Sequence, residues 1–62
     1  MNYTILAQKH CKPCHVAKEN LENNGGTVTM VFLEDSPWAR TLMKKAGLKT
    51  TPQVFNDKGE LV

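Results

Sequence analysis

Strand-like and helix-like segments alternate along this 62-residue chain, and their order limits the folds that it can adopt. Residues 2–8 (NYTILAQ) and 27–34 (TVTMVFLE) are rich in β-branched and other apolar residues, which predicts two strands. Between them, Cys14, Ala17 and Leu21 are spaced three and four residues apart, as on the apolar face of a short helix. The Asn-Asn-Gly-Gly run that follows is typical of a helix end. Such a β-α-β unit is long enough for its two strands to be parallel.

A second helix is predicted within residues 35–48 (DSPWARTLMKKAGL). Ser36 is a candidate N-cap, Pro37 suits the first helical position, and Gly47 is suited to the helix end. In so small a domain, a tryptophan in the first turn of this helix, Trp38, is expected to belong to the core.

Two short apolar segments close the sequence, 52–55 (PQVF) and 59–62 (GELV). They flank an Asn-Asp-Lys-Gly turn with Gly59 at the place that favours positive φ, which predicts an antiparallel hairpin. We therefore expect a single α/β domain over residues 1–62, with the order β-α-β-α-β-β and a mixed four-stranded sheet.

Composition excludes several classes of protein. The hydrophobic fraction of 40% suits a small globular fold with a thin core. Eight basic residues are balanced by six acidic ones, and the net charge of +2 does not favour a nucleic-acid partner. No apolar run approaches the length of a membrane span or a signal sequence, so we expect a cytoplasmic protein without a membrane partner.

The two cysteines lie at the expected junction between the first strand and the first helix. Unpaired N–H groups and the helix dipole favour negative charge there, and Lys9 and Lys12 add positive charge nearby. Cys11 is therefore the candidate attacking thiolate. Cys14 lies one turn further on the inward face of the helix, so it is the candidate resolving thiol. Pro13 is tolerated in the first turn, where helical N–H groups lack partners.

Other chemistries are compatible with the letters Cys-x-x-Cys-His. The pair could form a static disulfide or remain two unrelated thiols. Covalent haem attachment requires an axial ligand, and Met30 and Met43 look like core residues. A zinc site requires four ligands, and the nearby candidates are crowded into six residues: His10, Cys11, Cys14 and His15. We favour a redox dithiol with no metal, with His10 and His15 at its rim.

Two motifs resemble the glutaredoxins, a family with the thioredoxin fold. CKPCHVAKENLENNG follows the family pattern Cys-x-x-Cys-His-x-Ala-Lys, and TTPQVF resembles Thr-Val-Pro-Gln-Ile-Phe. The resemblance covers essentially the whole chain. It implies that Pro52 is cis and faces the disulfide, that the backbone of Thr51 pairs with an extended thiol substrate, and that Gln53 contacts glutathione. It also implies that Lys9 and Lys12 are glutathione contacts, with glutathione as co-substrate and no bound cofactor.

The sequence departs from the family pattern at three places. Gln8 occupies the position at which the family usually has lysine, and Lys12-Pro13 replaces the usual Pro-Tyr between the cysteines. The family also continues beyond the position of Val62 with a Gly-Gly turn, an acidic residue and a last helix. We therefore expect a truncated domain that exposes apolar side chains on one sheet face, and dimerisation is one way to cover that face.

The resulting functional expectation is a glutaredoxin-like thiol–disulfide oxidoreductase that acts in electron transport and cell redox homeostasis. Its expected substrates are protein disulfides and glutathione mixed disulfides. A second hypothesis is a hydrogen donor for ribonucleotide reductase that is coupled to thioredoxin reductase. A third is a non-catalytic binding module or an inactive fragment.

Overall fold

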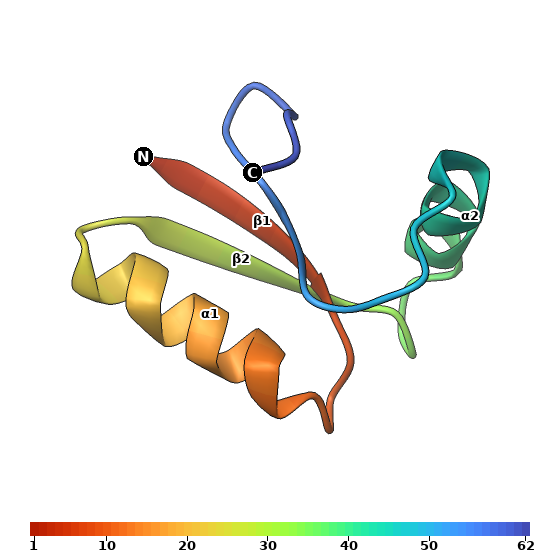
Figure 1. Ribbon diagram of the computed structural model, residues 1–62, viewed down its shortest axis with the longest axis horizontal. Coiled ribbons are helices and arrows are strands. Elements are labelled where there is room, and N and C mark those ends of the chain that lie inside the picture. The colour runs from red at the N-terminus through yellow and green to blue at the C-terminus, as the bar shows by residue number, and fades with distance from the viewer.

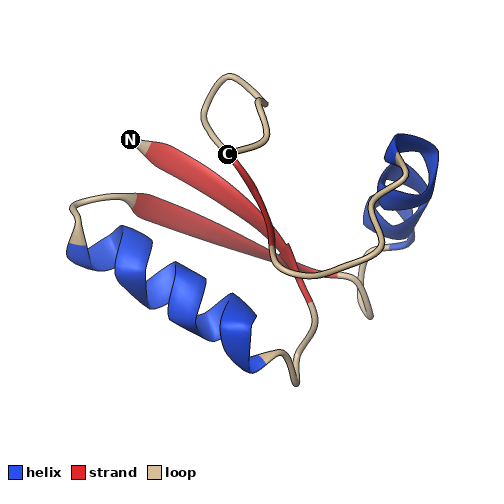
Figure 2. Ribbon diagram, in the orientation of Figure 1, coloured by secondary structure: helices blue, strands red, loops and turns tan.

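A computed structural model describes residues 1–62 and shows three strands and two helices. The elements in chain order are β1 (Asn2–Ala7), α1 (Lys12–Asn23), β2 (Thr27–Phe32), α2 (Pro37–Ala46) and β3 (Gln53–Phe55). The strands form one twisted sheet, with α1 lying along it and α2 standing beside one end (Figures 1 and 2). The mixed α/β class and the order of the first five elements match the prediction.

The central strand of the sheet is β1, because the strand order is β2-β1-β3. The β1 and β2 strands are parallel, with Asn2 opposite Thr27 and Ala7 opposite Phe32. The β3 strand is antiparallel to β1, with Thr4 opposite Phe55. The predicted parallel crossover through α1 is therefore confirmed.

The predicted fourth strand, residues 59–62, is reduced to one antiparallel bridge between Phe55 and Leu61, so the sheet has three strands instead of four. The Asn56 carboxamide oxygen accepts the backbone N–H groups of Lys58 (3.0 Å) and Glu60 (2.9 Å). Because the turn extends through Glu60, only the residues beyond it can return alongside β3. The predicted antiparallel direction and the positive φ of Gly59 (77°) are confirmed.

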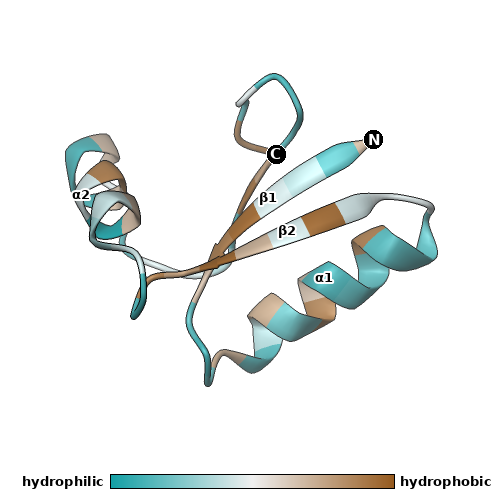
Figure 3. Ribbon diagram, turned by 180° about the vertical axis from the view of Figure 1, so that it is seen from behind, coloured by the Kyte–Doolittle hydropathy of each residue, from teal (hydrophilic) through white to brown (hydrophobic).

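Alternate residues of the strands contribute to two apolar clusters, as the two-residue period of a strand requires. Ile5 and Ala7 are fully buried in one cluster with Cys14 of α1. Leu6 is buried with Ala39 and Met43 of α2. Figure 3 shows brown, apolar residues along parts of both long strands, while most of α1 is coloured as hydrophilic. The sheet thus joins the two helices through separate clusters.

The second helix has the predicted termini but does not bury Trp38. Pro37 occupies its first turn, and Gly47 ends it in the left-handed conformation with φ 71°. Ser36 is the N-cap residue but makes no side-chain capping bond. Trp38 is 58% exposed, so its predicted place in the core is wrong, because the buried face of α2 is formed by Ala39 and Met43.

The predicted exposure of strand side chains is also wrong at Leu6, which is only 1% exposed beneath α2. The exposed large apolar side chains instead lie at the two ends of the chain and on the helices: Met1, Val16, Trp38, Leu42, Leu61 and Val62. Neither helix combines the length and apolar character needed to cross a membrane.

Candidate redox site

The cysteine pair sits where the chain turns from β1 into α1. Cys11 is the N-cap of α1, with extended φ and ψ of −93° and 101°, and its backbone N–H donates to the Gln8 carbonyl at 3.2 Å. The two cysteines form a disulfide with Cα atoms 5.3 Å apart. Cys14 is fully buried, whereas Cys11 is partly exposed. The burial of Cys14 agrees with its predicted position on the inward face of the helix.

The helix start places a hydrogen-bond donor directly on the sulfur of Cys11. The backbone N–H of Cys14 donates to Cys11 Sγ over 3.2 Å, the capping contact usually made by a side-chain oxygen. No acidic residue lies in the first turn of α1. A negative charge on Sγ would therefore meet an N–H donor and the positive end of the helix dipole.

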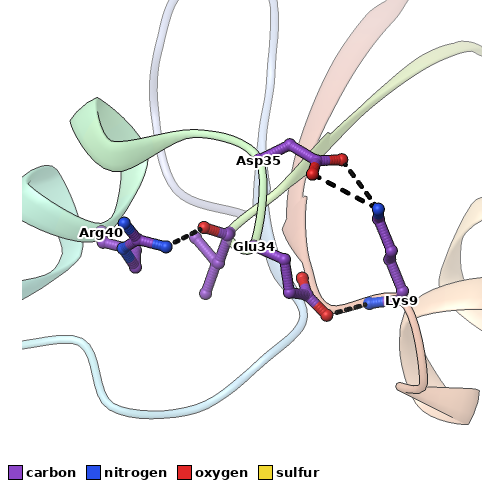
Figure 4. Close-up of polar contacts among 5 residues, drawn as sticks. Lys9, Glu34, Asp35 and Arg40 are labelled. Atoms are coloured by element: carbon purple, nitrogen blue, oxygen red, sulfur yellow. Dashed lines mark hydrogen bonds and ion pairs between the residues drawn. The ribbon is translucent and has the colours of Figure 1, made fainter.

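The loop that leads into Cys11 is held through Lys9. The Lys9 backbone N–H donates to Glu34 Oε2 at 2.8 Å, and its Nζ lies 3.1 Å from Asp35 Oδ2 (Figure 4). The Lys9 carbonyl oxygen lies 3.1 Å from Nε2 of His15 on α1. On the other side, Arg40 of α2 donates to the Leu33 carbonyl at 2.9 Å. The loop after β2 thus connects the approach to Cys11 with α2.

The pKa of the Glu34 carboxyl is lowered from its ordinary value of 4.5, chiefly because the carboxylate accepts the Lys9 backbone N–H. Our sequence reasoning missed Glu34 and Asp35. They come two and three residues after the end of β2, and the carboxyl ends of parallel strands meet at the same edge of a sheet. That position in the sequence is the signal that would have indicated them.

A segment distant in the sequence completes the site. The Thr51–Pro52 peptide bond is cis, as the family resemblance implies. The Thr51 hydroxyl oxygen lies 3.4 Å from Cys11 Sγ and 3.4 Å from the Gln8 carboxamide oxygen. The loop before β3 therefore touches both the Cys11 sulfur and the loop after β1.

The other predicted contact residues differ in their surroundings. Lys12 is the exposed first residue of α1. The Lys9 ammonium is paired with Asp35, and the Gln53 carboxamide donates to the Thr50 carbonyl at 2.8 Å. No group of three or more His, Cys, Asp or Glu side chains is arranged to hold a metal ion. Met30 and Met43, the candidate axial ligands for a haem, lie in the two separate apolar clusters.

Comparison with known proteins agrees with this geometry. No curated protein matches the chain. Among solved structures, a mutant of the thioredoxin-like protein BC3987 superposes with a TM-score of 0.80 at 31% identity, covering 97% of this chain and 77% of that one. The family model described as Glutaredoxin matches residues 3–62, which include both cysteines and the cis-proline segment. The chain therefore belongs to the glutaredoxin family and has a thioredoxin-like fold.

Proposed function

We propose that this protein is a dithiol thiol–disulfide oxidoreductase that reduces protein disulfides and glutathione mixed disulfides. The Cys11 thiolate attacks one sulfur of the substrate disulfide, forming a mixed disulfide and releasing the other substrate sulfur as a thiolate that takes up a proton. Cys14 then loses its proton and attacks Cys11 Sγ, which releases the second substrate thiol. Two electrons pass to the substrate, and the Cys11–Cys14 disulfide remains.

The observation that carries this proposal is the difference between the two sulfur atoms. Cys11 is partly exposed at the N-cap with the Cys14 N–H directed at its sulfur, while Cys14 is fully buried on the inner face of the helix. An accessible, stabilised thiolate beside a sheltered second thiol is what a two-step exchange requires. The family membership supports the same reaction.

Return to the dithiol form requires an external reductant, for which glutathione is the first candidate. Two glutathione thiols would supply two electrons and leave as glutathione disulfide. In the proposed complex, the free backbone groups of Thr51, beside Pro52, pair with the cysteine of glutathione, and Gln53 and Lys12 lie toward its carboxylates. Lys9 joins them only after its ammonium leaves Asp35. We propose the cytoplasm as the place of action, because its glutathione pool keeps such thiols reduced.

The pairing of Lys9 with Asp35 favours a second candidate as electron source. A lysine already neutralised by a carboxylate attracts anionic glutathione less strongly than a free one. Reduction by thioredoxin reductase, with ribonucleotide reductase as a recipient of the electrons, would not depend on that charge.

One assay separates these possibilities. Reduction of a protein disulfide is followed with glutathione and glutathione reductase, and in parallel with thioredoxin reductase, each driven by NADPH. Turnover with the first system supports the glutathione proposal, and turnover only with the second supports the alternative. Absence of turnover with both would leave a non-catalytic binding module.

Variants of the two cysteines test their separate roles. Cys11→Ser should abolish every reaction. Cys14→Ser should abolish reduction of protein disulfides and accumulate a mixed disulfide on Cys11, which is detected as a mass adduct, while it spares removal of glutathione. If both variants lose all reactions equally and no adduct accumulates, the attacking and resolving roles are wrong.

A further inference from the structure

The hydroxyl group of Thr51 faces two acceptors from two different segments. It lies 3.4 Å from Cys11 Sγ at the start of α1 and 3.4 Å from Gln8 Oε1 in the loop after β1. A threonine hydroxyl has a single hydrogen, so it makes one strong donation at a time. The two acceptors therefore compete for the same proton donor.

The outcome of this competition depends on the charge of the sulfur. A disulfide sulfur is neutral and a weak acceptor, whereas an amide oxygen such as Gln8 Oε1 is a good one. After reduction, a thiolate on Cys11 becomes the stronger acceptor, since hydrogen bonds to charged groups are about twice as strong as neutral ones. The Cys14 N–H, 3.2 Å from the same sulfur, strengthens its bond in the same way.

We propose that Thr51 is a catalytic residue whose hydroxyl turns from Gln8 to the Cys11 sulfur when the disulfide is reduced, and there stabilises the attacking thiolate. Gln8 is then the resting acceptor that holds the hydroxyl while the disulfide is intact. This inference rests on the proposed role of Cys11 as the attacking thiol. Reduction adds two electrons and one proton: Cys14 becomes the thiol, Cys11 becomes the thiolate, and the Thr51 proton stays on its own oxygen.

The hydroxyl acts without changing the charge of the site. Thr51→Val removes the donor, keeps the branched shape of the side chain and leaves every ionisable group in place. The ionisable side chains of the segments around Cys11 come from its own loop, the first turn of α1, the loop after β2 and the loop after α2: Lys9, His10, Lys12, His15, Glu34, Asp35 and Lys49.

Removal of the hydroxyl donor should change both the Cys11 pKa and the redox potential in a predictable direction. A hydrogen bond to a charged group contributes enough to move an equilibrium about tenfold, so Thr51→Val should raise the pKa of Cys11 by about one unit. The reduced form loses the same stabilisation, and a tenfold change equals about 30 mV for a two-electron couple. The variant should therefore be more reducing at a pH above the Cys11 pKa. The difference should vanish at a pH below it, where the sulfur is a neutral thiol.

The test measures the rate at which iodoacetamide alkylates Cys11 in the reduced protein as a function of pH, with the modified residue identified by peptide mass. Wild type is compared with Thr51→Val and with Thr51→Ser, which keeps the hydroxyl. The matched control is Thr50→Val, which removes a neighbouring hydroxyl that contacts Gln53 instead of the sulfur. We expect a rise of about one pKa unit only in Thr51→Val. Circular dichroism of each variant establishes that it is folded.

Gln8→Ala provides an independent arm, because it removes the competing acceptor. It should lower the Cys11 pKa when Thr51 is present and leave it unchanged in the Thr51→Val background. If Gln8→Ala changes the Cys11 pKa equally in both backgrounds, Gln8 does not compete for the Thr51 hydroxyl. The proposed turn of the hydroxyl from Gln8 to the Cys11 sulfur is then wrong.

The result also separates this inference from the proposed function. If folded Thr51→Val matches wild type in Cys11 pKa and in potential while wild type reduces disulfides, the role of Thr51 is refuted and the oxidoreductase stands. If wild type reduces no disulfide and its Cys11 titrates near the ordinary thiol value of about 8.5, the proposed function fails and the role of Thr51 fails with it.

Discussion

The leucine pair Leu6 and Leu42 gives a matched test of how α2 is held to the sheet. Leu6 is 1% exposed and packs with Ala39 and Met43, whereas Leu42 on α2 is 44% exposed. Leu6→Ala leaves a cavity between sheet and helix. Core Leu→Ala changes lower the free energy of unfolding by about 2–5 kcal/mol. We expect a cost in the lower half of this range, because α2 can move into part of the cavity.

The expected cost at Leu42 is smaller. Burying a whole leucine contributes about 1.5–3 kcal/mol, and little more than half of Leu42 is buried. Alanine also has the higher helix propensity, so Leu42→Ala should cost about 1 kcal/mol or less. A domain of 62 residues has a total stability of about 3–9 kcal/mol, so the Leu6 change removes a large part of it.

Urea unfolding of the oxidised proteins, followed by far-ultraviolet circular dichroism, measures both costs. With an m-value of about 1 kcal/mol/M, the midpoint should fall by roughly 2–3 M for Leu6→Ala and by less than about 1 M for Leu42→Ala. Equal midpoints for the two variants would refute the reasoning, because they would mean that α2 does not cover Leu6 in solution.

Two further changes probe the loops. Gly26→Ala should cost about 1–3 kcal/mol in urea unfolding, because its Cβ would lie 2.9 Å from the Leu21 carbonyl oxygen and 3.1 Å from the Tyr3 ring; an unchanged midpoint would contradict that close approach. Glu34 has a lowered pKa in the folded protein, so its contribution is present above the ordinary value of 4.5 and is lost as the pH falls through the folded pKa. Glu34→Gln should therefore be less stable than wild type at pH 6, with a gap that narrows in acid, and a gap independent of pH would show that the carboxylate charge is not involved.

Much of the fold could be predicted because local patterns and packing agree. The period of Cys14, Ala17 and Leu21 identifies α1, and Pro37 and Gly47 bound α2 in the structure as in the sequence. These signals act within one helical turn of the residues concerned. The number of strands was harder to predict, because the side-chain bonds of Asn56 lengthen the final turn at the expense of the returning strand.

In the site, too, features set by local sequence could be predicted, whereas features set by tertiary contacts could not. The positions of Cys11 and Cys14 at the start of α1 could be predicted from the local helix pattern, and the cis Thr51–Pro52 bond from a family motif. The ion pair of Lys9 with Asp35 and the contact of Glu34 with the Lys9 backbone join residues 26 and 25 positions apart. Such contacts depend on how two loops meet in space, which no local pattern records. The exposure of Trp38 escaped prediction for a similar reason, since the rotation of α2 about its axis decides which side chains face the sheet.

The position of β1 between its two partners has a consequence for how the site assembles. Asn2 pairs with Thr27, whereas Thr4 pairs with Phe55, so the second pairing closes a loop about twice as long. That doubling adds roughly 0.6 kcal/mol of loop-closure entropy, and β3 has only three residues with which to offset it. The cysteine pair belongs to the shorter-range β1–α1–β2 unit, but Thr51 reaches it through β3. Transient opening of β3 therefore separates the hydroxyl from the sulfur while both cysteines keep their places, and amide hydrogen exchange should be faster in β3 than in β1.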